Sequence, residues 1–142
     1  MKVLHITNEF TKKNFSISSL IIYISAHLNI NYKVNYSILT SSLEQTLFAN
    51  IRIKLINFNS WLHYFTKKNK LIEIFKDYKV VHIHGIWAPI QLISLLVCIN
   101  LKKPCVVHPH GMLLDEAVKS AGLIKYVLKK FTLFCLKYLI SY

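Results

Sequence analysis

The chain is short of acidic residues, glycine and cysteine. It holds six Asp and Glu against 18 Lys and Arg, a formal net charge of +12, so we expect an anionic partner such as a nucleotide or a negatively charged membrane surface. It has three glycines. Its cysteines, Cys98, Cys105 and Cys135, are scattered through apolar segments. This spacing argues against a disulfide framework or a metal knuckle and favours small buried side chains in a reducing compartment.

Membrane spans and targeting signals are missing as well. No uncharged apolar stretch reaches about 18 residues, and Ser19 to Tyr32 is interrupted by His27 and two asparagines. The opening apolar run is short and ends at Thr7 without a cleavage-like site, so it is not a signal peptide. No zinc module, RNP-type motif or helix-turn-helix pattern accompanies the lysines, so nucleic acid is not expected as a partner. We expect a cytoplasmic protein whose 142 residues form one domain.

The segment from Lys79 to Met112 contains the same phrase twice, an apolar run followed by His-x-His and glycine. The first copy is Val80 to Gly85 (VVHIHG) and the second is Val106 to Gly111 (VVHPHG). Between them, Ala88 to Leu101 has the length of one crossover helix, which joins parallel strands. In an open α/β sheet the carboxyl ends of parallel strands share one edge, here called the rim, where such folds bind ligands. We therefore expect a Rossmann-like, three-layer α/β domain with a mostly parallel sheet.

The rest of the chain alternates strand and helix patterns. The first expected elements are a strand at Lys2 to Thr7, a polar loop at Asn8 to Asn14, a helix at about Ile17 to Leu28 capped by Asn14 or Ser16, and a strand at Tyr32 to Thr40. They are followed by a loop or short helix at Ser41 to Asn50, a strand at Ile51 to Phe58 and a helix at Trp61 to Lys79. A covering helix is expected from Asp115 to about Ile140, with Lys119, Lys125, Lys129, Lys130 and Lys137 on one side. Val3 to Ile6, Val80 to Ile83 and Val106 to His108 are expected to be buried central strands.

Each phrase offers two histidines, of which the second lies nearer the rim. A period of two puts His82 and His84 on one face of their strand, and His108 and His110 likewise. His84 and His110 are the candidates for function, because the glycine after each leaves room for a ligand to approach the backbone. His82 and His108, one step further into the sheet, are expected to be hydrogen-bonded core histidines.

The segments VVHIHGIWAP and KKPCVVHPHGMLLDEA together resemble the amino-terminal domain of retaining glycosyltransferases of the GT-B fold. This large nucleotide-sugar-dependent family builds lipopolysaccharide, capsule and exopolysaccharide. The resemblance implies that residues 1–142 are the acceptor-side domain of an enzyme that transfers a sugar to a glycan or lipid-linked acceptor, peripherally on the inner face of the cytoplasmic membrane. It implies a nucleotide sugar as co-substrate and neither a cofactor nor a metal. The donor-binding domain is missing and must act in cis or in trans, so the isolated chain is expected to be inactive.

The resemblance also assigns site residues. His110 matches the histidine that faces the transferred sugar, where an imidazole can hydrogen-bond a hydroxyl or stabilise developing charge. His84, Gly85 and Trp87 match the acceptor-side loop, and an indole there offers an apolar face and an N–H. The substrate-binding set is completed by Asn8, Ser16, Gly111 and Met112. The first loop lacks the family's glycines, so its binding of an anion through the helix amino terminus is as plausible as a plain capped loop.

Three alternatives stay open. Two His-x-His pairs on adjacent strand ends could ligate zinc in a metal hydrolase. Against this, Pro109 lies inside one pair, the inner histidines are expected to point into the sheet, and Asp115 and Glu116 lie past the turn. The chain could instead be a non-catalytic domain that binds an acceptor, a partner chain or a membrane. Finally, Trp61 to Lys79 could lie on an anionic bilayer or pack its aromatic residues on the sheet.

Overall fold

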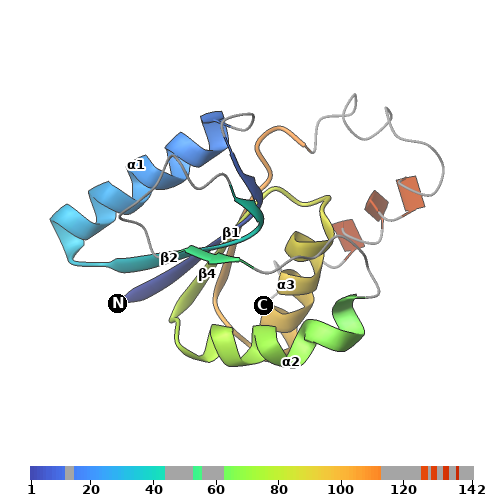
Figure 1. Cartoon of the computed structure of the whole chain (residues 1–142). Coiled ribbons are helices and arrows are strands. Elements are labelled where there is room, and N and C mark those ends of the chain that lie inside the picture. Colours follow the sequence, from blue (N-terminus) through green and yellow to red (C-terminus); the bar gives the residue numbers. More distant parts are fainter. Residues whose placement is uncertain are drawn as a thin grey trace.

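The computed structural model describes residues 1–11, 15–43, 53–55, 63–112, 126, 127, 129, 130, 133, 134 and 137, with backbone alone for 53–55 and 63–65. Five strands form one sheet, namely β1 (Lys2–Phe10), β2 (Asn35–Leu43), β3 (Ile53–Leu55), β4 (Val80–His84) and β5 (Cys105–His108). Their order is β3-β2-β1-β4-β5, and every neighbouring pair is parallel (Figure 1).

Helices cover both faces of this sheet. Helix α1 (Phe15–Tyr32) lies on one face, while α2 (His63–Lys76) and α3 (Pro89–Asn100) lie on the other (Figure 1). Right-handed crossovers require this arrangement, because the chain first moves outward from β1 to β3 and then restarts at β4 on the opposite side of β1. The Rossmann-like α/β fold is confirmed. Its strand order reverses between β1 and β4, the place where open α/β sheets bind ligands.

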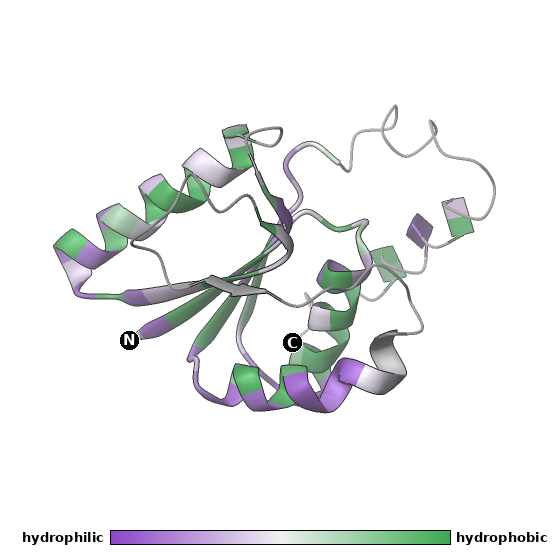
Figure 2. Cartoon of the chain, viewed as in Figure 1, coloured by the Kyte–Doolittle hydropathy of each residue, from purple (hydrophilic) through white to green (hydrophobic). Residues whose placement is uncertain are grey.

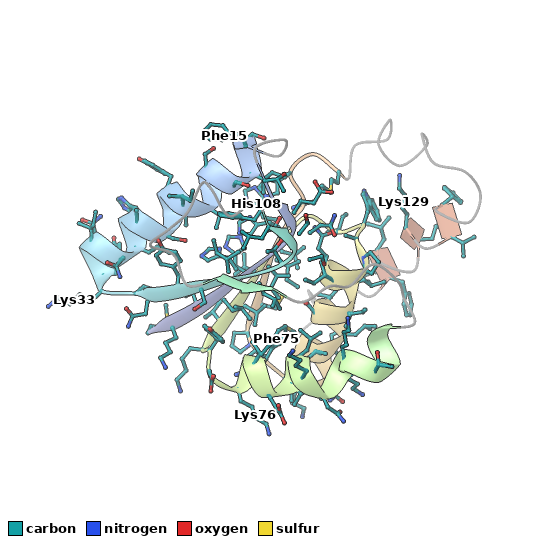
Figure 3. The ribbon with its side chains drawn as sticks, in the orientation of Figure 1. Phe15, Lys33, Phe75, Lys76, His108 and Lys129 are labelled. Carbon is teal, nitrogen blue, oxygen red and sulfur yellow. The ribbon has the colours of Figure 1, made fainter. Side chains whose placement is uncertain are left out.

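The face toward α2 and α3 carries the larger apolar core. Its buried residues come from β1, β4, α2 and α3 and include Leu4, Ile6, Val81, Ile83, Leu71, Phe75, Ile90 and Ile93. Complete burial of a side chain such as Phe75 contributes about 2–3 kcal/mol. Phe75 points into the sheet and Lys76 points away from it (Figure 3). The outer side of α2 is hydrophilic (Figure 2). In its described side chains, α2 therefore packs its apolar residues on the sheet.

The first strand is longer than expected. The sequence predicted a polar loop from Asn8, but β1 continues to Phe10, because Glu9 pairs with Ser42 and Phe10 with Leu43 of β2. Pairing with β2 satisfies the backbone of this polar segment, and backbone groups need such partners whatever the side chains are.

Helix α1 is also longer than expected, and the next strand starts later. Ser16 lies inside α1 and does not cap it, and Tyr32 is its last residue rather than the start of a strand. Lys33 then adopts a left-handed φ of 52° and its N–H donates to the carbonyl of Asn29, while the Asn29 amide donates to the carbonyl of Val34. These bonds satisfy the helix end locally, which delays β2 to Asn35.

Strand β5 forms as predicted, but it is not central. Among the described residues it pairs with β4 alone, and Val106 is 51% exposed. His108 is exposed on the same face. The expectation of a buried central strand was therefore wrong for Val106 to His108 and correct for Val3 to Ile6 and Val80 to Ile83. A β-branched run indicates a strand without fixing its place in the sheet.

Several expectations lie outside the described residues. They concern Lys12, Lys13 and Asn14, Trp61, Asp115 and Glu116, most of the segments expected at 41–50 and 51–58, and most of the covering helix. The described residues of that last segment are helical, but Lys129, expected on its lysine-rich side, is 6% exposed. Among the helices that the structure describes, none is long and apolar enough to cross a bilayer.

Candidate functional site

The sheet face toward α1 carries imidazoles where the opposite face carries aliphatic side chains. We call this group the histidine cluster; its members are His5, His82, His84, His108 and His110. Strand register assembles it, because His5 of β1 lies beside His82 of β4, and His84 lies beside His108 of β5. The cluster therefore begins at the β1–β4 boundary and extends to the rim.

Four side chains form a continuous line of hydrogen bonds, which we call the histidine relay. Ser25 Oγ of α1 lies 3.2 Å from His5 Nε2, His5 Nδ1 lies 3.0 Å from His84 Nε2, and His84 Nδ1 lies 3.1 Å from His110 Nε2. A neutral imidazole has one N–H and one acceptor nitrogen, so the relay has two consistent arrangements. Every N–H points either toward His110 or toward Ser25. Helix α1 is thus connected to the rim through buried groups.

His110 reaches the relay through a turn and not by strand alternation. Strand β5 ends at His108, and Pro109, which has no N–H, begins a turn closed by the Met112 N–H on the Pro109 carbonyl at 3.0 Å. His110 adopts a left-handed φ of 50° within it. Its ring stacks on that of His84 with centroids 5.3 Å apart, and on that of His108 at 4.1 Å. The turn therefore brings the rim imidazole back over the sheet.

Burial and neighbouring histidines lower the pKa of four members of the cluster, His5, His82, His84 and His110. Burial, and then the neighbouring histidines, lower the pKa of His84 to about 2. Burial is also the main cause that lowers the pKa of His5 and of His82 to about 4. The pKa of His110 is lowered by burial and by His108. Neutral imidazoles can donate and accept hydrogen bonds or ligate a metal.

Gln91 of α3 fixes the end of β4. Its Nε2 donates to the carbonyl of His84 at 2.6 Å, and its Oε1 accepts from the N–H of Ala88 at 2.8 Å. Gly85 adopts a left-handed φ of 86° here, and a Cβ at this position would collide with Gln91 Nε2 and come within 3.2 Å of Met112 Cε. The Gly85 N–H donates to the carbonyl of His108 at 2.8 Å. The glycine is thus required for close packing between strand end and helix.

The two histidines chosen as functional candidates have different environments. His84 is 1% exposed and lies between His5 and His110, so it supports the rim rather than lining it. His110 is partly exposed, as a ligand contact requires. The inner pair differs from expectation: His82 Nε2 is buried without a hydrogen-bond partner, and His108 is exposed. His108 is exposed because no described element covers its face of β5.

Trp87 follows the first phrase and packs on the apolar core. The ammonium of Lys129 lies 5.0 Å from the centre of the Trp87 ring, a cation–π contact. Trp87 Nε1 is buried and has no hydrogen-bond partner. Figure 3 shows Lys129 and His108 in the upper half of the molecule.

The remaining residues predicted to bind substrate lie in three different parts of the structure. Gly111, with a φ of 77°, and Met112 belong to the turn that carries His110. Asn8 lies in β1, where its carbonyl accepts a hydrogen bond from the Thr40 hydroxyl. Ser16 is exposed on the first turn of α1. The cluster meets this helix at Ser25, about two and a half turns further on, so Ser16 lies away from it.

His5 and Ser25 were not identified from the sequence. A signal for His5 was present, because it interrupts the apolar run from Val3 to Ile6, and a buried polar group in such a run needs a partner. Nothing in the helical pattern distinguishes Ser25 from the other serines of α1.

No protein-family profile and no curated protein matches the chain. Among solved structures, UDP-GlcNAc 2-epimerase from Neisseria meningitidis bound to UDP-GlcNAc matches with a TM-score of 0.61 and 13% identity, over 93% of this chain and 38% of that one. This likeness agrees with a Rossmann-like α/β fold. The UDP complex of S. aureus MnaA gives a TM-score of 0.55 and 14% identity, over 75% of this chain and 28% of that one. The chain spans well under half the length of both proteins.

Proposed function

We propose that the chain is the acceptor-side half of a retaining, nucleotide-sugar-dependent glycosyltransferase of cell-envelope polysaccharide synthesis, acting at the cytoplasmic face of the membrane. The observation that carries the proposal is the position of His110, a partly exposed imidazole at the rim that is linked through His84 to His5 at the β1–β4 boundary. The resemblance of the two His-x-His-Gly segments favours a transferase. The likeness in fold to proteins whose structures contain UDP-GlcNAc or UDP supports a sugar nucleotide as the ligand class.

His110 suits contact with a sugar. Its Nε2 is bonded to His84, which orients the ring, and its Nδ1 takes no part in that bond. A neutral imidazole can donate to or accept from a hydroxyl through this second nitrogen and can stabilise charge that develops during transfer. The buried, unpartnered N–H of Trp87 is a further donor that a ligand oxygen can satisfy.

Transfer also requires groups that hold the phosphates of the donor, and by the resemblance these belong to a second domain. The test supplies a GT-B donor-binding domain, fused after Tyr142 or as a separate chain, and measures sugar transfer to a glycan acceptor by mass spectrometry. We expect no transfer by the chain alone and transfer with both parts, with retention at the anomeric carbon. His110→Ala should then lower turnover by about 100-fold, and His27→Ala, on the exposed side of α1, should not change it. Transfer by the chain alone, or transfer indifferent to His110, contradicts the proposal.

A second candidate is epimerisation of a sugar nucleotide, favoured by the likeness to the N. meningitidis enzyme bound to UDP-GlcNAc. The same reconstituted protein, incubated with UDP-GlcNAc and no acceptor, distinguishes the two reactions by NMR. Inversion at C2 without transfer in the presence of acceptor replaces the transferase proposal with an epimerase. An unchanged UDP-GlcNAc spectrum, with transfer once acceptor is added, supports the transferase.

We also propose that the chain associates with an anionic membrane surface through charge. Lys70 and Lys76 are exposed on α2, whereas Phe75 is buried beneath it, so among these described side chains the lysines and not the aromatic ring can face a membrane. Co-sedimentation should favour anionic over neutral vesicles and weaken with salt. Lys70→Glu with Lys76→Glu should weaken it about tenfold. If the chain sediments with both vesicle types but transfers no sugar when reconstituted, these results are better explained by a non-catalytic domain that binds a membrane surface.

A further inference from the structure

Three members of the histidine cluster converge on one point at the rim. Candidate ligand nitrogens of His84, His108 and His110 all lie within 4.8 Å of one another. His84 Nδ1 and His110 Nε2 are 3.1 Å apart. Two nitrogens bound to one tetrahedral zinc at about 2.0–2.1 Å lie about 3.3 Å apart, so this pair needs little movement. We propose that His84, His108 and His110 bind one zinc ion and leave its fourth position open at the rim.

The chemistry of the ligands selects the metal. All three ligands are imidazole nitrogens, and the cluster contains no carboxylate. Magnesium and calcium prefer oxygen ligands, whereas imidazole suits zinc, cobalt, nickel and copper. Three histidines with one open position is an arrangement that zinc uses when it binds a water or a substrate.

The histidine relay prepares His84 as a ligand. Zinc on His84 Nδ1 requires the proton of this ring to be on Nε2, from where it donates to His5 Nδ1, and the proton of His5 is then on Nε2 and donates to Ser25 Oγ. For His5 and His84 this is one of the two arrangements that the relay already allows, whereas the proton of His110 moves from Nε2 to Nδ1 so that Nε2 can bind the ion. Zinc therefore selects one tautomer of each ring. Outer hydrogen bonds of this kind orient metal-bound histidines.

Access decides which histidines hold the ion. His5, His82 and His84 form a second group of similar spacing, but it lies behind the first and shares His84 with it. His108 is exposed and His110 partly exposed, so an ion from solvent meets the outer group first. The sequence disfavours zinc because the inner histidines are expected to point into the sheet and Pro109 lies inside one pair. In the structure His108 is exposed, and Pro109 begins the turn that brings His110 to His84.

The test measures zinc binding by the whole chain, purified without a polyhistidine tag and stripped with a chelator. Calorimetry should give one zinc per chain, and cobalt(II) should give the visible absorption of a tetrahedral site. His108→Ala and His110→Ala should each weaken zinc binding by about 100-fold or more, because each removes one of three ligands. Ser25→Ala, which removes the last outer hydrogen bond, should weaken it about tenfold. His27→Ala, at an exposed histidine of α1, should leave it unchanged.

Zinc binding that is absent in the parent chain, or unchanged in both His108→Ala and His110→Ala, overturns the proposal. Circular dichroism establishes that each variant is folded, and His108→Gln replaces His108→Ala if the latter is not. Zinc binding requires no donor domain or sugar and is independent of the proposed function. Loss of zinc binding with intact transfer refutes the zinc site alone, and zinc binding without reconstituted transfer refutes the transferase alone.

Discussion

The two His-x-His-Gly phrases are nearly identical in sequence and have different places in the structure. The first ends β4, which lies between β1 and β5; its histidines are largely buried, and its glycine packs against Gln91. The second ends β5 at the edge of the described sheet. There His108 is exposed, and His110 lies in a turn beyond the strand. The first phrase therefore supports the site, and the second presents it to ligands.

The difference follows from neighbours and not from the phrase. A strand paired on both sides and covered by helices buries whatever side chains it carries, including histidine. Pro109 in place of Ile83 ends the second strand two residues earlier relative to its glycine. A repeated motif therefore predicts two strand ends at one rim but does not predict equal roles for them.

The largest expected effect comes from acid acting on the first phrase and on His5, which lies beside it in β1. At His5, His82 and His84, whose folded pKa values are about 4, 4 and 2, the unfolded chain binds protons below its pKa of 6.5 while the folded chain does not. Their contribution to stability is thus complete above pH 6.5 and is lost as the pH falls. For the metal-free chain, we expect the free energy of unfolding to drop by roughly 4 kcal/mol between pH 7 and pH 5, about 2 kcal/mol each from the buried His5 and His84 and less from the partly exposed His82. Urea titrations across this range provide the measurement.

A matched variant shows whether β4 is responsible. His82→Leu removes a buried imidazole whose Nε2 has no partner, so the variant should lose less stability between pH 7 and pH 5 than the parent chain. An unchanged pH slope in this variant would contradict the assignment.

The next effect compares the two glycines. Gly85→Ala should destabilise the chain by about 3 kcal/mol, because the left-handed backbone is strained by a Cβ and Gln91 must give up its hydrogen bonds. Gly111→Ala meets the left-handed strain at a φ of 77° and should cost about 1 kcal/mol. Denaturant midpoints of the two variants test the order. Equal losses would mean that the first strand end is not more tightly packed than the second.

The smallest effect compares two valines. Val81 is fully buried against α2 and α3, so Val81→Ala should lower the free energy of unfolding by about 2 kcal/mol. Val106, half exposed on the edge strand, should cost less than about 0.5 kcal/mol when replaced by alanine. Thermal unfolding of both variants at one pH is sufficient. A large loss at Val106 would show that another part of the chain covers this face of β5.

The sequence was sufficient for the fold and for part of the site. Apolar runs, helical spacing and the length of the crossover predicted parallel strands with the histidines at one edge, because these features depend on local geometry. The alternation rule failed at His110, since Pro109 ends the strand and a turn determines where that ring lies. His5 and Ser25 joined the site through strand register and helix packing, which depend on contacts distant in the sequence. The buried position of Lys129 over Trp87 has the same kind of origin.

The histidine relay gives helix α1 and the rim a shared two-state element. If one ring changes tautomer without its neighbour, two N–H groups or two lone pairs face each other across about 3 Å, an error that costs on the order of 1–3 kcal/mol in a buried site. His5, His84 and His110 therefore change together or not at all. A ligand that accepts a hydrogen bond from His110 selects one tautomeric state of the relay, and a ligand that donates a hydrogen bond to His110 selects the other. Ser25 is the donor to His5 in the first state and the acceptor in the second. Whether the group bound at the rim donates or accepts a hydrogen bond thus determines whether Ser25 of α1 donates or accepts, without displacement of the backbone.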